Sequence, residues 1–124
     1  MAEIHLLEEI CSKTHEILQL ATKELPIPAE EKARDARKMM SVFTYSIIKE
    51  LSEDVDVHED DIYLRYLMGG GLSADQGRNI VERTRDEFTK REFGAASMQA
   101  GKEVAKKWQK GDKDIQPALH KLLA

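Results

Sequence analysis

The chain of 124 residues has 41% hydrophobic residues, 34% charged residues and a net charge of −4. These values are typical of one globular, soluble domain and exclude a disordered chain. No apolar run reaches the roughly 18 residues of a membrane span, and the first residues lack the basic start and apolar core of a signal peptide. Cys11 is the single cysteine, so no intramolecular disulfide can form and we expect a cytoplasmic protein.

Charge is distributed unevenly between the two halves. Residues 1–62 carry 15 acids and 7 bases, a balance of −8, and residues 63–124 carry 8 acids and 12 bases, a balance of +4. Such halves attract each other within one chain or between two copies. Neither half is basic enough to make nucleic acid the expected partner.

Two long amphipathic helices are predicted in the first half. Over residues 2–24, apolar side chains recur at helical spacing and form a face wider than one neighbouring helix would cover: Ile4, Leu6, Leu7, Ile10, Cys11, Thr14, Ile17, Leu18, Leu20, Ala21. This width predicts a central position in a bundle or a subunit interface. Pro26 and Pro28 end the first helix. A second seam then runs from Ala33 to Leu51, so we expect an antiparallel helical hairpin.

Four shorter helices are predicted after residue 51. Asp56 is the expected N-cap of a third helix, which stops at three glycines, and Ser73 with Gln76 forms a capping box for a fourth. We expect Gly94 to break this fourth helix. A fifth helix over 95–110 has small residues on one face (Ser97, Gly101, Ala105), Gly111 as its cap, and a last helix capped by Asp114.

The predicted fold is therefore all-α: one domain, 1–124, forming a compact bundle of five to six helices with a long N-terminal hairpin. The expected core consists of residues on the apolar faces of these helices: Leu7, Leu18, Phe43, Ile47, Leu67, Val81, Phe88, Val104, Trp108, Leu119.

The glycine turn and the arginines of the fourth helix form the best candidate binding site: Gly69, Gly70, Gly71, Ser73, Arg78, Arg85. Three glycines let the chain reverse sharply, and the helix N-terminus at Ser73 can hold an anion weakly. The turn lacks the lysine of a P-loop. We expect Gly70→Val to destabilise the protein more than Arg85→Ala does.

Metal binding has weaker support. His5 with Glu9, and Cys11 with His15, lie one helical turn apart, but the Glu-x-x-His pairs of carboxylate-bridged bundles are missing. Seven carboxylates lie between Glu50 and Asp61, yet a calcium loop starting at Asp54 would have Glu59 in place of its glycine. We therefore predict no metal site and no cofactor.

No catalytic motif marks the chain as an enzyme. The favoured interpretation is a small protein–protein interaction or regulatory module that binds a protein partner, first of all a second copy of itself. One alternative is a nucleic-acid-binding protein of helix-turn-helix type, although Glu82, Asp86 and Glu87 lie among its arginines. A second alternative is a helical bundle that binds a metal or a small ligand.

Overall fold

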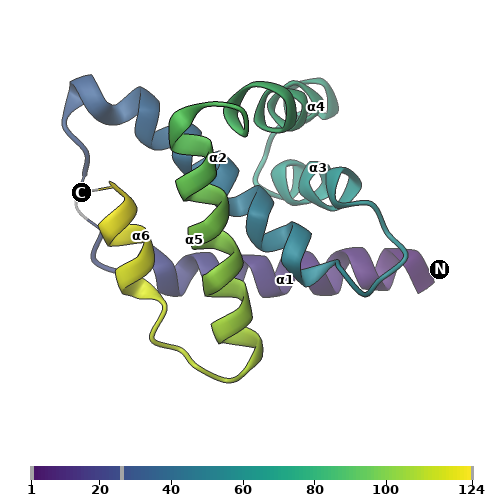
Figure 1. Cartoon of the computed structure of the whole chain (residues 1–124). Coiled ribbons are helices and arrows are strands. Elements are labelled where there is room, and N and C mark those ends of the chain that lie inside the picture. The colour runs from purple at the N-terminus through teal and green to yellow at the C-terminus, as the bar shows by residue number, and fades with distance from the viewer. Residues whose placement is uncertain (1, 26, 124) are drawn as a thin grey trace.

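The computed structural model describes the backbone of residues 2–25 and 27–123, and the side chains of these residues except 2–4 and 93. The predictions for the side chain of Ile4 and for Pro26 lie outside the described residues. Within them the chain forms six α-helices, one π-helical segment and no strand (Figure 1), which confirms the all-α bundle. Across the described residues, none of the helices combines the length and the hydropathy that crossing a membrane requires.

The first two helices are α1 (Ala2–Ala21) and α2 (Glu30–Leu51), and α2 runs back across α1 (Figure 1). The helix α1 ends three residues earlier than expected, in a turn where Glu24 has φ 60°. Ile10, Ile17 and Ala21 of α1 are buried, because α2, α3, α5 and α6 all pack on it. The wide apolar face is thus covered within the chain along the C-terminal part of α1.

Helix α5 (Glu92–Gln109) packs on α2 more extensively than any other pair of elements in the described chain does. Gly101 makes this possible, since a Cβ atom there would lie 2.6 Å from the carbonyl oxygen of Phe43 and 2.8 Å from Cβ of Ser46. Ser46 Oγ donates a hydrogen bond to the Met98 carbonyl at 2.6 Å. The predicted close approach of the small-residue face to another backbone is confirmed.

Helices α3 (Glu59–Gly69) and α4 (Ala74–Arg83) form a second hairpin around the glycine turn. The capping box of Ser73 and Gln76 is confirmed, with both of its hydrogen bonds present. The predicted cap of α3 is wrong: His58, not Asp56, is the N-cap, and its Nδ1 accepts from the Asp60 backbone N–H at 3.1 Å. An imidazole nitrogen here replaces the carboxylate that the pattern favoured.

Only one of the three glycines in the turn has a backbone conformation that other residues rarely adopt. Gly71 has φ 104°, whereas Gly70 has φ −85° and its Cβ position meets no atom closer than 3.4 Å. Because positive φ is costly for residues with a Cβ atom, the strain expected from Gly70→Val applies instead to Gly71.

The fourth helix ends differently from the prediction. After Arg83 the helix widens into the π-helical segment η1 (Thr84–Phe88), where the Thr89 N–H bonds back to the Thr84 carbonyl at 3.2 Å. Gly94 does not break the helix but lies inside α5. A Cβ atom at Gly94 would lie 2.1 Å from the Phe88 carbonyl oxygen, so this glycine lets α5 start directly against the end of η1.

The last helix, α6 (Gln116–Leu123), returns to the end of α1. His120 Nε2 and Gln116 both bond to the Lys23 carbonyl beyond the α1 C-terminus. Gly111 follows α5 with φ 87°, as its predicted capping role requires. Asp114 is not the cap of α6, because α6 begins at Gln116 and the Asp114 N–H bonds to the Asp112 carboxylate at 3.0 Å.

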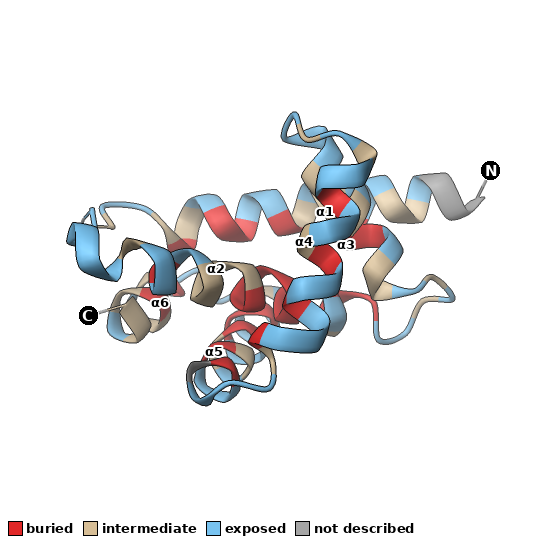
Figure 2. Cartoon of the chain, turned by 90° about the horizontal axis from the view of Figure 1, so that it is seen from above, coloured by how far each residue is buried: buried red, intermediate tan, exposed pale blue. Residues whose placement is uncertain are grey.

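The core lies where α1, α2, α3 and α5 meet, and buried residues face inward on each of these helices (Figure 2). Seven of the predicted core residues are buried: Leu18, Phe43, Ile47, Val81, Phe88, Val104, Leu119. The predictions for Leu7, Leu67 and Trp108 are only partly right, since these side chains are half-buried at the edge of the core. The Trp108 Nε1–H is itself buried and has no hydrogen-bond partner within the described residues.

Candidate functional site

An open apolar groove of about 1040 Å³ lies between the N-terminal half of α1 and the C-terminal half of α3. We call it the α1–α3 groove. Its apolar lining comes from both helices and from the residue after the glycine turn: Leu7, Cys11, Leu64, Tyr66, Leu67, Met68, Leu72. Polar and charged side chains complete it: Glu8, Ser12, His15, Asp61, Arg65. Small-molecule pockets commonly measure about 300–1,000 Å³, so this groove, which is open to solvent, is at the upper end of that range.

The groove follows the N-terminal half of α1, where the apolar face of this helix is less completely buried than in its C-terminal half. The N-terminal end of α1 extends beyond the other helices (Figure 1). Along the chain its apolar face changes from half-buried at Leu7 and Cys11 to fully buried at Ile17 and Ala21. Met68 is 44% exposed, and it is one of two large apolar side chains, with Ile27, that are exposed among the described residues.

An ion pair joins the two helices at the groove. Arg65 Nη2 of α3 lies 2.9 Å from Glu8 Oε1 of α1, and about half of each side chain is exposed. In water such a pair contributes little to stability, about 0–1 kcal/mol. Both charges therefore remain accessible to a partner.

The four weak metal-ligand candidates do not converge. His5 and His15 are exposed, Glu9 pairs with Lys13 at 3.1 Å, and the Cys11 thiol donates to the Ile62 carbonyl at 3.6 Å. Burial raises the pKa of Cys11, so the thiol stays protonated at neutral pH. Within the described part of the chain, no three His, Cys, Asp or Glu side chains are grouped closely enough to hold a metal ion.

The predicted binding residues lie at the two opposite ends of the α3–α4 hairpin. Gly69 and Gly70 border the α1–α3 groove. Ser73 and Arg78 belong to the start of α4, where Arg78 pairs with Asp75 at 3.1 Å. Arg85 lies at the other end of the α3–α4 hairpin, because it contacts Asp60 in the first turn of α3. The glycine turn and Arg85 therefore cannot form one compact site.

Arg85 belongs to a polar network that no pattern in the sequence predicts. Its Nη1 donates to Asp60 Oδ2 at 2.8 Å, and the buried Tyr45 hydroxyl donates to Asp60 Oδ1 at 2.9 Å. Arg85 also pairs with Asp86, which raises the pKa of Arg85, and Arg85 lowers the pKa of Asp86. The network connects α2, α3 and η1. Its carboxylates also neutralise the charge of Arg85, which a nucleic-acid phosphate would otherwise contact.

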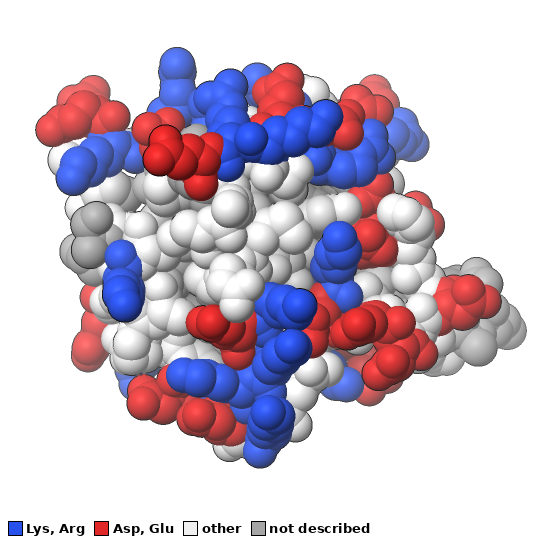
Figure 3. Space-filling model, in the orientation of Figure 1, with Lys and Arg blue, Asp and Glu red and all other residues white. Residues whose placement is uncertain are grey.

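The face of the molecule shown in Figure 3 carries charges of both signs instead of a uniformly basic stripe. On the face shown in Figure 3, charged side chains of both signs gather along the edge formed by α4, η1 and the start of α2, and the centre over the first half of α5 is uncharged. Because phosphate neutralisation supplies most non-specific affinity for nucleic acid, interleaved acids weaken such binding. On this face of the described chain, the mixed charges do not favour the helix-turn-helix alternative.

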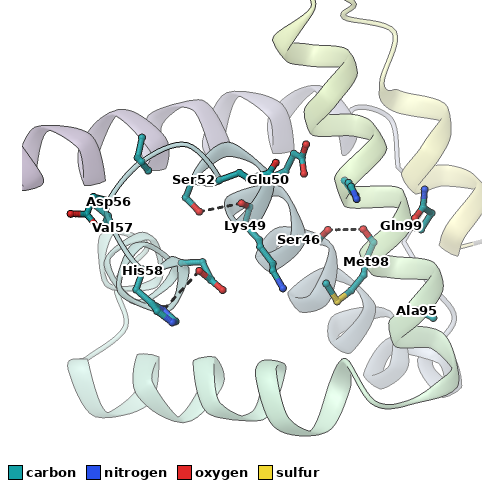
Figure 4. A pocket seen from close by; sticks show the side chains of 14 residues that line it. Ser46, Lys49, Glu50, Ser52, Asp56, Val57, His58, Ala95, Met98 and Gln99 are labelled. Carbon is teal, nitrogen blue, oxygen red and sulfur yellow. Dashed lines mark hydrogen bonds and ion pairs between the residues drawn. The ribbon is translucent and has the colours of Figure 1, made fainter.

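A second recess, of about 680 Å³, lies between α2, α5 and the 52–58 loop. Ser46 and Met98 form one wall, and Val57 and His58 form the opposite one (Figure 4). Its rim holds four carboxylates and two lysines: Glu50, Glu53, Asp56, Glu59, Lys49, Lys102. Most of these charges are exposed, so the recess is a solvated polar surface without a converging set of catalytic groups.

The three tyrosines of the chain provide a test of how the helices α2 and α3 are packed. Burial raises the pKa of Tyr45, Tyr63 and Tyr66 above the ordinary value of 10.0, and the hydrogen bond to Asp60 adds to the effect at Tyr45. The folded protein keeps these phenol protons when the unfolded chain has released them. Stability is therefore unaffected by the tyrosines below about pH 10 and falls above it, by up to about 1.4 kcal/mol per pH unit for each fully buried phenol.

We expect the buried Tyr45 and Tyr63 to form tyrosinate only together with loss of helical circular dichroism, so that at most the half-buried Tyr66 titrates in the folded protein. In Tyr45→Phe, the alkaline decline in stability should be shallower. Tyrosinate formation by more than one ring at about pH 10 with the helices intact would contradict the burial of Tyr45 and Tyr63.

Comparison with known protein families, with curated protein sequences and with solved structures finds no match for this chain.

Proposed function

We propose that this protein is a protein-interaction module and that the α1–α3 groove is its docking site. The supporting observation is that residues which the sequence pattern predicts to be in the core lie instead on the accessible surface of the groove. Leu7 and Leu67 have the helical spacing of core residues but line the open groove, beside the exposed Met68. Apolar surface that the chain covers only in part, and that charged residues border, is a feature of protein-binding sites.

The shape of the groove favours a helix as the docked element. Its walls are two helices, and α3 has 11 residues, which at 1.5 Å per residue is about 16 Å of wall. A helical segment of about three turns has this length. Such segments present apolar residues at i, i+3 or i+4, and i+7 to a groove of this type.

A photoreactive residue placed in the groove tests the proposal. We would introduce Met68→benzoylphenylalanine into the full chain, irradiate cells that produce it, and look for covalent adducts with protein. The matched control is Glu82→benzoylphenylalanine, because Glu82 is exposed on α4 and does not line the groove. We expect a discrete protein adduct from position 68 and none from position 82. Absence of an adduct from position 68, or the same adducts from both positions, would overturn the proposal.

A further inference from the structure

We infer that the partner of the α1–α3 groove is a basic amphipathic helix, a segment of another protein in which lysines and arginines flank a row of apolar side chains. This inference rests on the proposed use of the groove for protein binding and adds the chemistry of the partner. The lining of the groove has a net negative charge, and the segments that form it carry an excess of acids. A partner must therefore match both an apolar lining and an acidic border.

The charged side chains of the lining are two acids and one base, Glu8, Asp61 and Arg65, with His15 counted as neutral. Arg65 is already paired with Glu8, since its Nη2 lies 2.9 Å from Glu8 Oε1. Asp61 is exposed, and it takes part in none of the ion pairs within the described residues. A basic side chain of a partner can therefore pair with Asp61 without displacing Arg65.

The segments around the groove have the same sign of charge. Residues 5–16, which include the α1 wall, carry three acids and one base. Residues 52–65, which include the loop before α3 and the first turns of this helix, carry six acids and one base. Exposed charges act over about 8 Å in physiological salt, so a helix docked along α3 lies in a negative potential. This potential attracts basic side chains and repels an acidic helix, a nucleic acid or an anionic lipid surface.

The apolar lining gives the other part of the partner's chemistry. Leu7 and Cys11 lie one turn apart on α1, and Leu64 and Met68 lie one turn apart on α3. Each wall therefore matches a docked helix with apolar residues at i, i+3 or i+4, and i+7. Positions beside this row point toward the borders of the groove, where Asp61 lies, so the basic residues of the partner belong there.

Synthetic peptides test the sign of the partner's charge. We would measure the fluorescence anisotropy of dilute labelled peptides of about 15 residues, a length that supports a helix, during titration with the full chain. The first peptide has leucine at i, i+3 and i+7 and lysine on both flanks. The second has glutamate in place of every lysine, and the third has the composition of the first but no apolar face. We expect the first to bind at least about tenfold more tightly than the other two.

Charge reversal in the groove tests where the peptide binds. In Asp61→Lys the lining has two bases and one acid, so the relative affinity should shift by about tenfold toward the glutamate peptide. Asp61→Asn removes the charge alone and should cause a smaller shift in the same direction. The matched control is Asp75→Lys, because Asp75 is also an exposed acid in the first turn of a helix but does not line the groove. It should keep the preference of the wild type.

Three results of these titrations would overturn the inference: no binding of the lysine peptide to the wild-type chain, equal binding of the lysine and glutamate peptides, or equal shifts in Asp61→Lys and Asp75→Lys. An adduct from position 68 in cells with the mass of two copies of this chain would also overturn it, and would leave the proposed function standing. The proposed function fails differently, when position 68 forms no protein adduct. Far-ultraviolet circular dichroism of every variant establishes that it is folded.

Discussion

Gly101→Ala is expected to lower the free energy of unfolding by about 3 kcal/mol, at the upper end of the usual cost of overpacking a core. The added methyl group would lie 2.6 Å from the Phe43 carbonyl oxygen and 2.8 Å from Ser46 Cβ. The first of these atoms belongs to the α2 backbone and cannot rotate away, so α2 and α5 must separate. Separation would also stretch the hydrogen bond from Ser46 Oγ to the Met98 carbonyl.

Gly69→Ala is the matched control for this prediction. Gly69 is the last residue of α3, and no atom lies within 4 Å of its Cβ position. Alanine is favoured over glycine in helices by up to about 1 kcal/mol, so Gly69→Ala should be neutral or slightly stabilising. Denaturant unfolding of both variants measures the difference. Equal stability of Gly101→Ala and the wild type would show that α2 and α5 are not in contact through this glycine.

The role of Gly101 was predictable because it lies in a regular pattern. Ser97, Gly101 and Ala105 recur every four residues, and a stripe of small residues on one helical face indicates close backbone approach. Gly94 has no such pattern around it, and in sequence a glycine that permits close packing cannot be distinguished from one that ends a helix. Nor does the sequence distinguish which glycine of the turn has an unusual backbone conformation. Gly70 was the predicted position, but of the three turn glycines only Gly71 has a positive φ.

The groove could be predicted only in part. Helical periodicity identified Leu7 and Leu67 as members of apolar faces, and it indicated that the face of α1 was wider than one neighbour could cover. Which part of that face stays open depends on where α3 crosses α1, and no local pattern fixes that position. Two predicted core residues therefore line the proposed docking site, together with Gly69 and Gly70 of the predicted binding turn.

The network of Tyr45, Asp60 and Arg85 could not be predicted at all. These residues are separated by 15 and 25 positions, and each has an ordinary local interpretation: a core aromatic, a helix-start acid and a surface base. The π-helical segment η1 adds to the difficulty, because it changes the helical register at Thr84 and so the direction in which Arg85 points. Only the folded arrangement brings the three together.

Asp60→Ala is expected to destabilise the protein by about 2 kcal/mol, because it leaves the Tyr45 hydroxyl buried without its acceptor. Tyr45 as a whole is only 5% exposed, so its hydroxyl would lose its acceptor where bulk water has little access. Asp61→Ala is the matched control: Asp61 shares the first turn of α3, where both acids interact favourably with the helix dipole, but it is exposed and outside the network. The difference between the two variants therefore measures the network itself.

A double-mutant cycle separates the free-energy cost of leaving the Tyr45 hydroxyl without an acceptor from the other effects of losing Asp60. In a Tyr45→Phe background the hydroxyl is already gone, so Asp60→Ala should cost clearly less than it does in the wild type. The remaining cost reports the contact between Asp60 and Arg85, which holds η1 against α3. Equal costs for Asp60→Ala in both backgrounds, or for Asp60→Ala and Asp61→Ala, would contradict the network.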